Sequence, residues 1–372
     1  MSTDREVTDA ELERRTILRR NLVPDTAAFL DTKIPGSQAK INYPLIGPGV
    51  SENGEQIVPV DEPHGFNLGG AVMPADTVNN LHLHFTAEVF LCFAGSWTFR
   101  WGVDGKDGEA TVSDGDVISI PTWIFRGFTS ESDDAWLYTA LGRDESGGLL
   151  WAPSVISAAA KTGMFLSTDH RLIEVEPGTV PEGVDLVQPM SEQDLAGLRR
   201  VSVEEMRTRL TRPGDLVWRP DALLDSGLPG GGAELALVIG YGLTEHRDQA
   251  PRLADPHGFS LAWLRAAPEA GVNRHRITEP QVLIAKSGRW RVTLNAENPV
   301  TAELGPFDTL SVPAGAWRRF ESIGSEAGQL AVLTSGDGRT RLDWDPAVVA
   351  AAGERNVAID ANGYVAPAHL VR

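Results

Sequence analysis

The feature that most constrains this chain is an internal repeat. The nine residues from Pro63, PHGFNLGGA, return from Pro256 as PHGFSLAWL, and the upstream motif IGPG returns as IGYG. Similarity that recurs at a fixed spacing indicates duplicated structural units. We therefore expect two domains of one design, at residues 46–143 and 239–335.

Composition indicates that both domains are built from strands. The 372 residues include 38 glycines and 24 prolines, which fits many short strands joined by turns rather than a helical bundle. The predicted fold is all-β, with two tandem antiparallel β-barrels, a helical connection between them, and a short helix and arm at the termini. The segments outside the barrels are residues 1–45, 144–238 and 336–372.

Three segments outside the barrels show helical signals. Residues 1–22 mix acidic, basic and apolar side chains in a pattern that predicts a short amphipathic helix, followed by an extended arm at 23–45. A short helix is expected at 154–161. The clearest helix runs from Ser191 to Arg212, with a serine N-cap and arginines near its end. These helices are expected to cover a barrel face or a subunit boundary.

Three potential metal ligands, His82, His84 and Glu88, lie within seven residues. Alternate side chains of a strand share one face, so both imidazoles point the same way, and Glu88 joins them if the strand continues. Gly95 then suits a tight turn, so the stretch is predicted to be a β-hairpin. Two imidazoles and one carboxylate form the ligand set of non-haem Fe(II) oxygenases. The alternative is a half-buried strand with two histidines and a solvated glutamate.

This spacing of ligands and glycine resembles the first motif of the cupin superfamily. The second cupin motif is similar to the sequence from Gly115, GDVISIPTWIFR, in which a tryptophan stands at the usual glycine and Arg126 at the usual histidine. With the repeat, the chain resembles a bicupin, which implies that both antiparallel barrels are jelly rolls. The resemblance implies one divalent metal ion per chain, held by His82, His84 and Glu88. Fe(II) is the first expectation, with Mn(II), Ni(II) and Zn(II) as alternatives.

Arg126 is the candidate catalytic residue beside this site. A cation near a metal invites an anion, and the planar guanidinium suits a substrate carboxylate held by two hydrogen bonds. The alternative is a framework arginine paired with an acid, because Arg318 occupies the matching place in the second repeat. His64 also has a counterpart, His257, so we expect a structural role for it.

The second repeat has lost the ligand set. Its matching positions hold His275, Ile277, Gln281 and Arg318. One imidazole with an aliphatic neighbour and a neutral amide holds a divalent ion poorly. We therefore expect the second barrel to be structural.

The leading functional hypothesis is a metal-dependent bicupin oxygenase or dioxygenase that acts on a small, acidic, aromatic or unsaturated substrate. Trp97, Phe99 and Trp101 share one face of a strand and would make such a pocket apolar, although the sequence leaves open whether that face is the interior. One alternative is a non-redox cupin isomerase, decarboxylase or lyase with the metal as Lewis acid. Another is a bicupin that binds a small ligand without catalysis.

Charge and cysteine content bound the partners. The net charge of −18 argues against nucleic acid and anionic membrane surfaces, which would repel the chain. The single cysteine, Cys92, excludes an internal disulfide, and no apolar run resembles a signal peptide or a membrane span. We expect a cytoplasmic protein with a small-molecule substrate. The terminal segments could be exchanged between subunits, which predicts a homodimer or higher oligomer.

Overall fold

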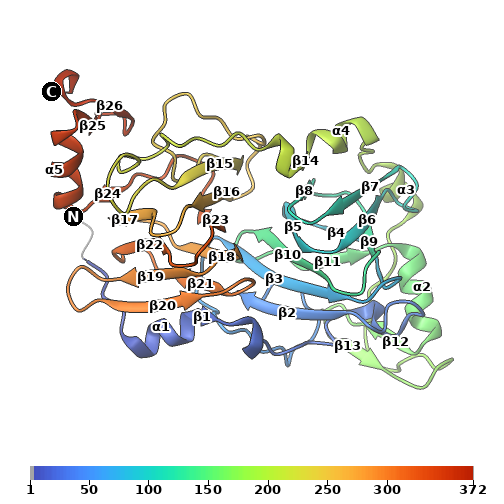
Figure 1. The fold of residues 1–372 in the computed structure, drawn as a ribbon. Helices are drawn as coiled ribbons and strands as arrows, with labels where there is room; N and C mark the ends of the chain where they lie inside the picture. Colours follow the sequence, from blue (N-terminus) through green and yellow to red (C-terminus); the bar gives the residue numbers. More distant parts are fainter. Residues whose placement is uncertain (1–3, 372) are drawn as a thin grey trace. The chain divides into compact units, whose positions relative to one another are not determined.

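The computed structural model describes residues 4–371, which form two compact units (Figure 1). Residues 23–213 are called barrel one, and residues 4–22 together with 214–371 are called barrel two. Each unit contains two large antiparallel sheets with apolar side chains between them. The predicted all-β fold of two tandem antiparallel barrels is confirmed.

The two sheets of barrel one contain six and five strands. The first has the order β14 (Leu210–Thr211), β8 (Val117–Ile120), β5 (Glu88–Ala94), β10 (Ala135–Gly142), β3 (Phe66–Met73) and β2 (Ile41–Ile46). The second has the order β11 (Leu149–Trp151), β4 (Val78–His84), β9 (Arg126–Ser130), β6 (Ser96–Trp101) and β7 (Gly108–Ser113).

Barrel two repeats this order strand for strand. Its six-stranded sheet runs β1 (Thr16–Ile17), β21 (Thr309–Val312), β18 (Gln281–Ser287), β23 (Gly328–Ser335), β16 (Phe259–Ala266) and β15 (Glu234–Ile239). Its five-stranded sheet runs, in the matching direction, β24 (Asp343–Trp344), β17 (Gly271–Arg276), β22 (Arg318–Ser322), β19 (Trp290–Leu294) and β20 (Val300–Leu304). The repeat seen in the sequence therefore holds for the complete topology.

The chain changes sheets at Gly95, so the predicted hairpin is wrong. Strand β5 pairs with β8 and β10, whereas β6 pairs with β7 and β9. Gly95 has a φ of +77°, and a Cβ there would lie 2.8 Å from the Cα of Ala135, which explains the glycine. The crossing turns Trp97, Phe99 and Trp101 into the core, where all three are fully buried.

The duplication also includes segments that the sequence comparison left out. Barrel one continues into α2 (Pro153–Lys161) and the hairpin β12 (Met164–Leu166) and β13 (Leu172–Glu174); barrel two continues into α5 (Pro346–Glu354) and the hairpin β25 (Val357–Ile359) and β26 (Val365–Pro367). Each helix follows a Trp-x-Pro sequence, which is the signal that could have revealed this. The helix predicted at 154–161 is confirmed.

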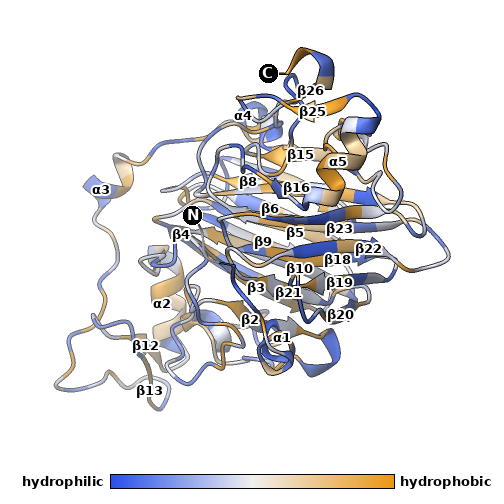
Figure 2. Ribbon diagram, turned by 90° about the vertical axis from the view of Figure 1, so that its left-hand side faces the viewer, coloured by the Kyte–Doolittle hydropathy of each residue, from blue (hydrophilic) through white to orange (hydrophobic). Residues whose placement is uncertain are grey.

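The helix predicted from Ser191 to Arg212 is wrong. Two shorter helices take its place, α3 (Glu192–Ala196) and α4 (Val203–Thr208). Serine side chains cap both, and the interruption begins at Gly197, a residue with low helix propensity. No residue of α3 is buried, and Figure 2 shows it as mostly hydrophilic, so a longer helix would have had no continuous apolar face to bury.

Each barrel is completed by a helix and a strand that precede the other barrel in sequence. The helix α1 (Asp9–Arg15) and β1 precede barrel one, yet β1 pairs with β21 of barrel two. The helix α4 and β14 precede most of barrel two, yet β14 pairs with β8 of barrel one. The limits of the two compact units in the sequence therefore lie at residues 22 and 213.

The remaining elements are short. Four 3-10 helices occur in the described chain, η1 (Arg19–Asn21), η2 (Leu30–Lys33), η3 (Pro213–Asp215) and η4 (Ala368–Leu370). The arm predicted as extended at 23–45 contains η2 and ends in β2. None of the helices within residues 4–371 is long and apolar enough to cross a membrane.

Candidate metal centre

The three predicted ligands converge from two different sheets. His82 and His84 lie on β4, and Glu88 is the first residue of β5. The strand does not continue between them, as the sequence argument had required, because the chain crosses to the other sheet after His84. Their ligand atoms nevertheless lie within 4.8 Å of one another, and all three residues are buried.

Hydrogen bonds orient the two imidazoles. Nδ1 of His82 lies 2.7 Å from the carbonyl oxygen of Asn80, which leaves Nε2 as the free nitrogen. Nδ1 of His84 lies 3.5 Å from the carbonyl oxygen of Gly148. Nε2 of His84 is buried without a hydrogen-bond partner and lies 3.4 Å from Oε1 of Glu88. An orphaned imidazole nitrogen beside a carboxylate fits a divalent metal ion.

Arg126 contacts Glu88 rather than the open space of the barrel. Its Nε donates to Oε2 of Glu88 at 2.8 Å, and its Nη1 donates to the carbonyl oxygen of Ile124 at 3.0 Å. Burial raises the pKa of the Glu88 carboxyl, but His84 and Arg126 outweigh it and hold that pKa well below its usual range. Glu88 is therefore a carboxylate whose Oε1 is available to a metal.

Both histidines are neutral, as metal binding requires. Burial, reinforced by the charge of Arg126, lowers the pKa of His82 well below its ordinary value. Burial also lowers the pKa of His84, although Glu88 opposes it. The donor set is thus two neutral imidazoles and one carboxylate, and the residues fit a divalent cation.

A cavity in barrel one reaches this cluster. The centre of a water molecule can occupy about 90 Å³ of it. The three ligands line it together with apolar side chains of both sheets, among them Phe90 and Phe128, and with the arm residues Phe29 and Lys40. Arg126 is fully buried and is not among the described residues that line the cavity.

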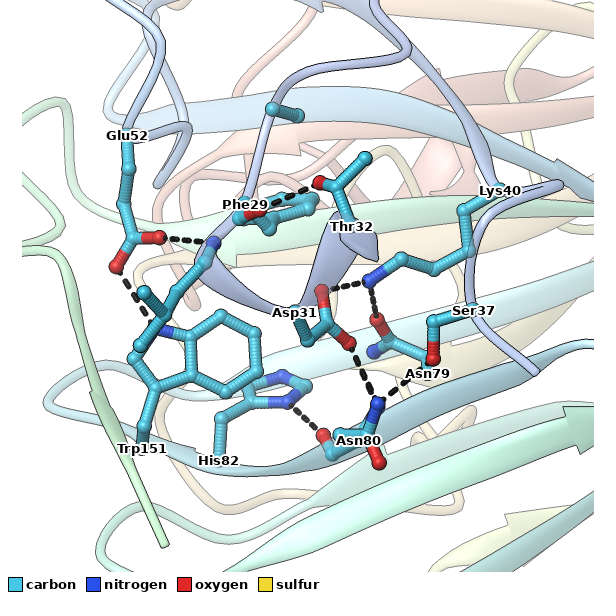
Figure 3. Close-up of polar contacts among 12 residues, drawn as sticks. Phe29, Asp31, Thr32, Ser37, Lys40, Glu52, Asn79, Asn80, His82 and Trp151 are labelled. Atoms are coloured by element: carbon cyan, nitrogen blue, oxygen red, sulfur yellow. Dashed lines mark hydrogen bonds and ion pairs between the residues drawn. The ribbon is translucent and has the colours of Figure 1, made fainter. Parts of the chain in front are cut away.

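The arm and the loop after β2 supply a polar network behind His82 that sequence reasoning missed (Figure 3). Glu52 accepts hydrogen bonds from the backbone N–H of Leu30 at 2.7 Å and from Nε1 of Trp151 at 2.8 Å. The ring of Trp151 packs against His82, with 5.5 Å between centroids. Burial raises the pKa of Glu52 to about 7, although the bond from Trp151 opposes it.

Barrel two contains the same network. Glu245 accepts from the backbone N–H of Leu224 at 2.7 Å and from Nε1 of Trp344 at 2.8 Å, and Trp344 packs against His275. The shared sequences Leu-Asp in the arm and Trp-x-Pro after the barrel could have revealed the pair. Because it occurs in both barrels, this network belongs to the framework.

The loss of ligands in barrel two is visible in its contacts. Arg318 donates to Oε1 of Gln281 at 3.3 Å, where Arg126 meets a carboxylate in barrel one. Burial lowers the pKa of Arg318 to about 9, although Glu279 opposes it. Ile277 lies in the hydrophobic core. The group of His, Asp, Glu or Cys residues that could hold a metal in residues 4–371 is the one in barrel one.

His64 is not brought to the metal ligands. Its Nδ1 lies 2.6 Å from the carbonyl oxygen of Glu62, and Nδ1 of His257 lies 2.6 Å from that of Asp255. The matching contacts in both barrels fit the structural role expected for this histidine.

The buried glutamate of barrel two makes stability depend on pH. Burial raises the pKa of Glu245 from 4.5 to about 8, although the bond from Trp344 opposes it. Below pH 4.5 the folded and unfolded chains both hold this proton; between about 4.5 and 8 only the folded chain holds it, so stability falls as the pH rises. In Glu245→Gln, chemical denaturation should show this slope reduced by up to about 1.4 kcal/mol per pH unit.

Glu52→Gln is the matched control for that measurement. The pKa of Glu52 is raised to about 7, so Glu52 should affect the slope of stability against pH only up to about pH 7, whereas Glu245 affects it up to about pH 8. A slope in Glu245→Gln equal to that of the wild-type chain would contradict the prediction.

Comparison with known proteins adds one result to this geometry. No protein-family model and no curated protein matches the sequence. Solved structures match: oxalate decarboxylase from Bacillus subtilis at pH 4.6 is 12% identical, with a TM-score of 0.51, over 91% of this chain and 79% of that one. The Lactobacillus farciminis oxalate decarboxylase formate complex is 10% identical, with a TM-score of 0.53, over 90% of this chain and 88% of that one.

This chain has the bicupin fold. The resemblance drawn from the two motifs is thereby confirmed at the level of fold. Within this bicupin, the retained ligand cluster lies in barrel one, and the matching positions of barrel two lack it. Another structure of the Bacillus subtilis enzyme concerns its Mn(II) centres.

Proposed function

We propose that barrel one is a metal-dependent active site for a small carboxylic acid. The proposed reaction is non-redox: a decarboxylation, another lyase reaction or an isomerisation. The observation that carries the proposal is the buried cluster of His82, His84 and Glu88 at a cavity that also contains a buried lysine. The similarity in fold to oxalate decarboxylases supports this reading over the oxygenase first expected.

The residues of barrel one would divide the work as follows. His82, His84 and Glu88 would hold a divalent ion, which when bound supplies Lewis-acid charge to a substrate carboxylate. The bond from His82 to Asn80 keeps its Nε2 free, and Arg126 positions Glu88 as a carboxylate. Apolar walls limit water, which strengthens electrostatic interactions in the cavity.

The role of Arg126 follows from its contacts. Its bond to Glu88 and its absence from the cavity lining favour a positioning role for the ligand carboxylate. Direct binding of the substrate anion by Arg126 stays a prediction.

The identity of the metal belongs to this proposal too. A Lewis-acid reaction needs a divalent ion but no redox change, so Mn(II) serves as well as Fe(II). The Mn(II) centres of the Bacillus subtilis decarboxylase, which shares the fold, make Mn(II) the first ion to load.

A metal-dependent oxygenase is the second candidate. The two-histidine, one-carboxylate set that supports it is the ligand set of non-haem Fe(II) oxygenases, and it leaves positions for O₂ and substrate.

An experiment separates these candidates. Protein loaded with Mn(II) or Fe(II) is incubated with small mono- and dicarboxylic acids while O₂ uptake and product formation are recorded. We expect substrate loss without O₂ uptake, at the same rate under argon, and none in a variant with His82→Ala and His84→Ala. O₂ uptake in step with product would establish the oxygenase instead. Binding without turnover of any acid would make this bicupin a binding protein.

A further inference from the structure

A buried lysine in barrel one has a role that neither the ligand set nor the framework explains. Lys40, immediately before β2, is only 8% exposed and lines the cavity. Its Nζ forms an ion pair with Asp31 and donates to Oδ1 of Asn79 at 2.9 Å (Figure 3). The ammonium also lies 5.1 Å from the centroid of the Phe29 ring. These contacts hold the cation at the cavity wall.

Lys40 and Asn79 each have a side-chain donor without an acceptor among residues 4–371. An ammonium has three donors, and Lys40 uses two, on Asp31 and Asn79. Neither the third donor nor Nδ2 of Asn79 has an acceptor among residues 4–371, and both residues line the cavity with the metal ligands. Two donors side by side suit the two oxygens of one carboxylate.

The backbone contact of this aspartate occurs in both barrels, with and without a lysine. Asp31 also accepts from the backbone N–H of Asn80 at 3.1 Å, and its counterpart Asp225 accepts from that of Asn273 at 2.7 Å. In barrel two the lysine position holds Ala233, and Oδ1 of Asp225 is buried without a hydrogen-bond partner. The aspartate thus orders the strand before the histidine in both barrels, and Lys40 is an addition in barrel one.

The polar lining of the cavity varies together with the metal ligands. Five polar residues of the barrel-one cavity have apolar counterparts in the hydrophobic core of barrel two. The five pairs are Lys40 and Ala233, Asn42 and Leu235, Asn79 and Val272, His84 and Ile277, and Thr139 and Val332. Where His84 and Glu88 are replaced, the lysine and its neighbours are absent too. This pattern associates them with the substrate rather than with the framework.

We propose that Lys40 and Asn79 bind a second carboxylate of the substrate, so that the substrate is a small dicarboxylic acid. The inference rests on the proposed function, in which the first carboxylate lies at the metal cluster. Two anionic ends then meet two cationic partners in one cavity, the metal ion and the ammonium of Lys40. A monocarboxylic acid would leave the ammonium donor of Lys40 without an acceptor.

Diacids and their half-amides test this directly, because each pair differs by one charge at nearly constant shape. Titration calorimetry would compare malonate with malonamate, and succinate with succinamate, on the Mn(II)-loaded chain. We expect one diacid to bind about tenfold or more tightly than its half-amide. In Lys40→Met this preference should disappear, while the affinity for the half-amide and the metal content stay unchanged.

Two further variants keep the test valid if Lys40→Met disturbs the fold. Lys40→Met combined with Asp31→Asn removes both charges and should lose the same preference. Asp225→Asn makes the matched change in barrel two and should leave the preference intact. A preference for the diacid that survives in the double variant overturns the proposal, as does a wild-type chain that prefers neither diacid.

Metal analysis of the same samples separates this inference from the proposed function. A wild-type chain that takes up no divalent ion overturns the proposed function itself. A chain with one ion per molecule and no preference that depends on Lys40 overturns only the assignment of the second carboxylate.

Discussion

Replacing His82 and His84 with alanine should reduce the divalent metal content from about one ion per chain to none, as measured by elemental analysis of purified, metal-reconstituted protein. The reason is that the two imidazoles and Glu88 make up the buried ligand cluster. Removing two of three ligands leaves a single carboxylate, which Arg126 already engages. Substrate turnover should disappear with the metal.

His275→Ala is the matched control for this prediction. His275 occupies the same place in barrel two, with the same bond from Nδ1 to a backbone carbonyl, that of Asn273, at 2.8 Å. Its neighbours in the ligand register are Ile277 and Gln281, so its loss should leave the metal content unchanged. Two ions per wild-type chain, or metal retained by the double variant, would refute the assignment.

The second large effect is expected at Arg126. In metal-free protein, Arg126→Ala removes the partner of a buried carboxylate and should lower the free energy of unfolding by about 3–5 kcal/mol. Added metal should recover part of this loss, because a divalent ion supplies another positive charge to Glu88. Urea denaturation with and without Mn(II) measures both effects.

Arg318→Ala shows what this arginine position contributes without a carboxylate. Arg318 donates to Gln281 and to the backbone carbonyls of Pro313 and Ala316, so its removal breaks no hydrogen bond to a carboxylate, and Glu279 acts on it through charge alone. Its loss of stability should be smaller than that of Arg126→Ala and should not respond to metal. Equal losses in both variants, with no effect of metal on either, would show that the bond to Glu88 contributes nothing measurable.

The parts of this structure that could be predicted from the sequence are those recorded in local pattern and in the repeat. The spacing of His82, His84 and Glu88 predicted their convergence, and the second copy of PHGF predicted the second barrel. The path between them could not be predicted in the same way. A strand that changes sheets and a hairpin that turns back have similar alternation, and Gly95 permits either.

The lysine was missed for a different reason. Lys40 is far from the ligands in sequence and lies in an arm with no periodicity, so no local rule connects it with them. Its importance depends on tertiary contacts with Asp31 and Asn79 and on a comparison with Ala233 in barrel two. Local pattern also suggested one long helix from Ser191, although the cap at Ser202 marked a second start.

The two edge strands β1 and β14, each of which precedes the other barrel in sequence, constrain the order in which the barrels can fold during synthesis. All of barrel one lies within residues 23–213, so this unit can be completed once that length has left the ribosome. Strand β1, by contrast, must wait for β21, whose Leu310 is the partner of Thr16. Strand β1 is therefore made before barrel one but is placed after it. The nascent chain can complete barrel one, which contains the candidate metal site, while β1 is still unpaired.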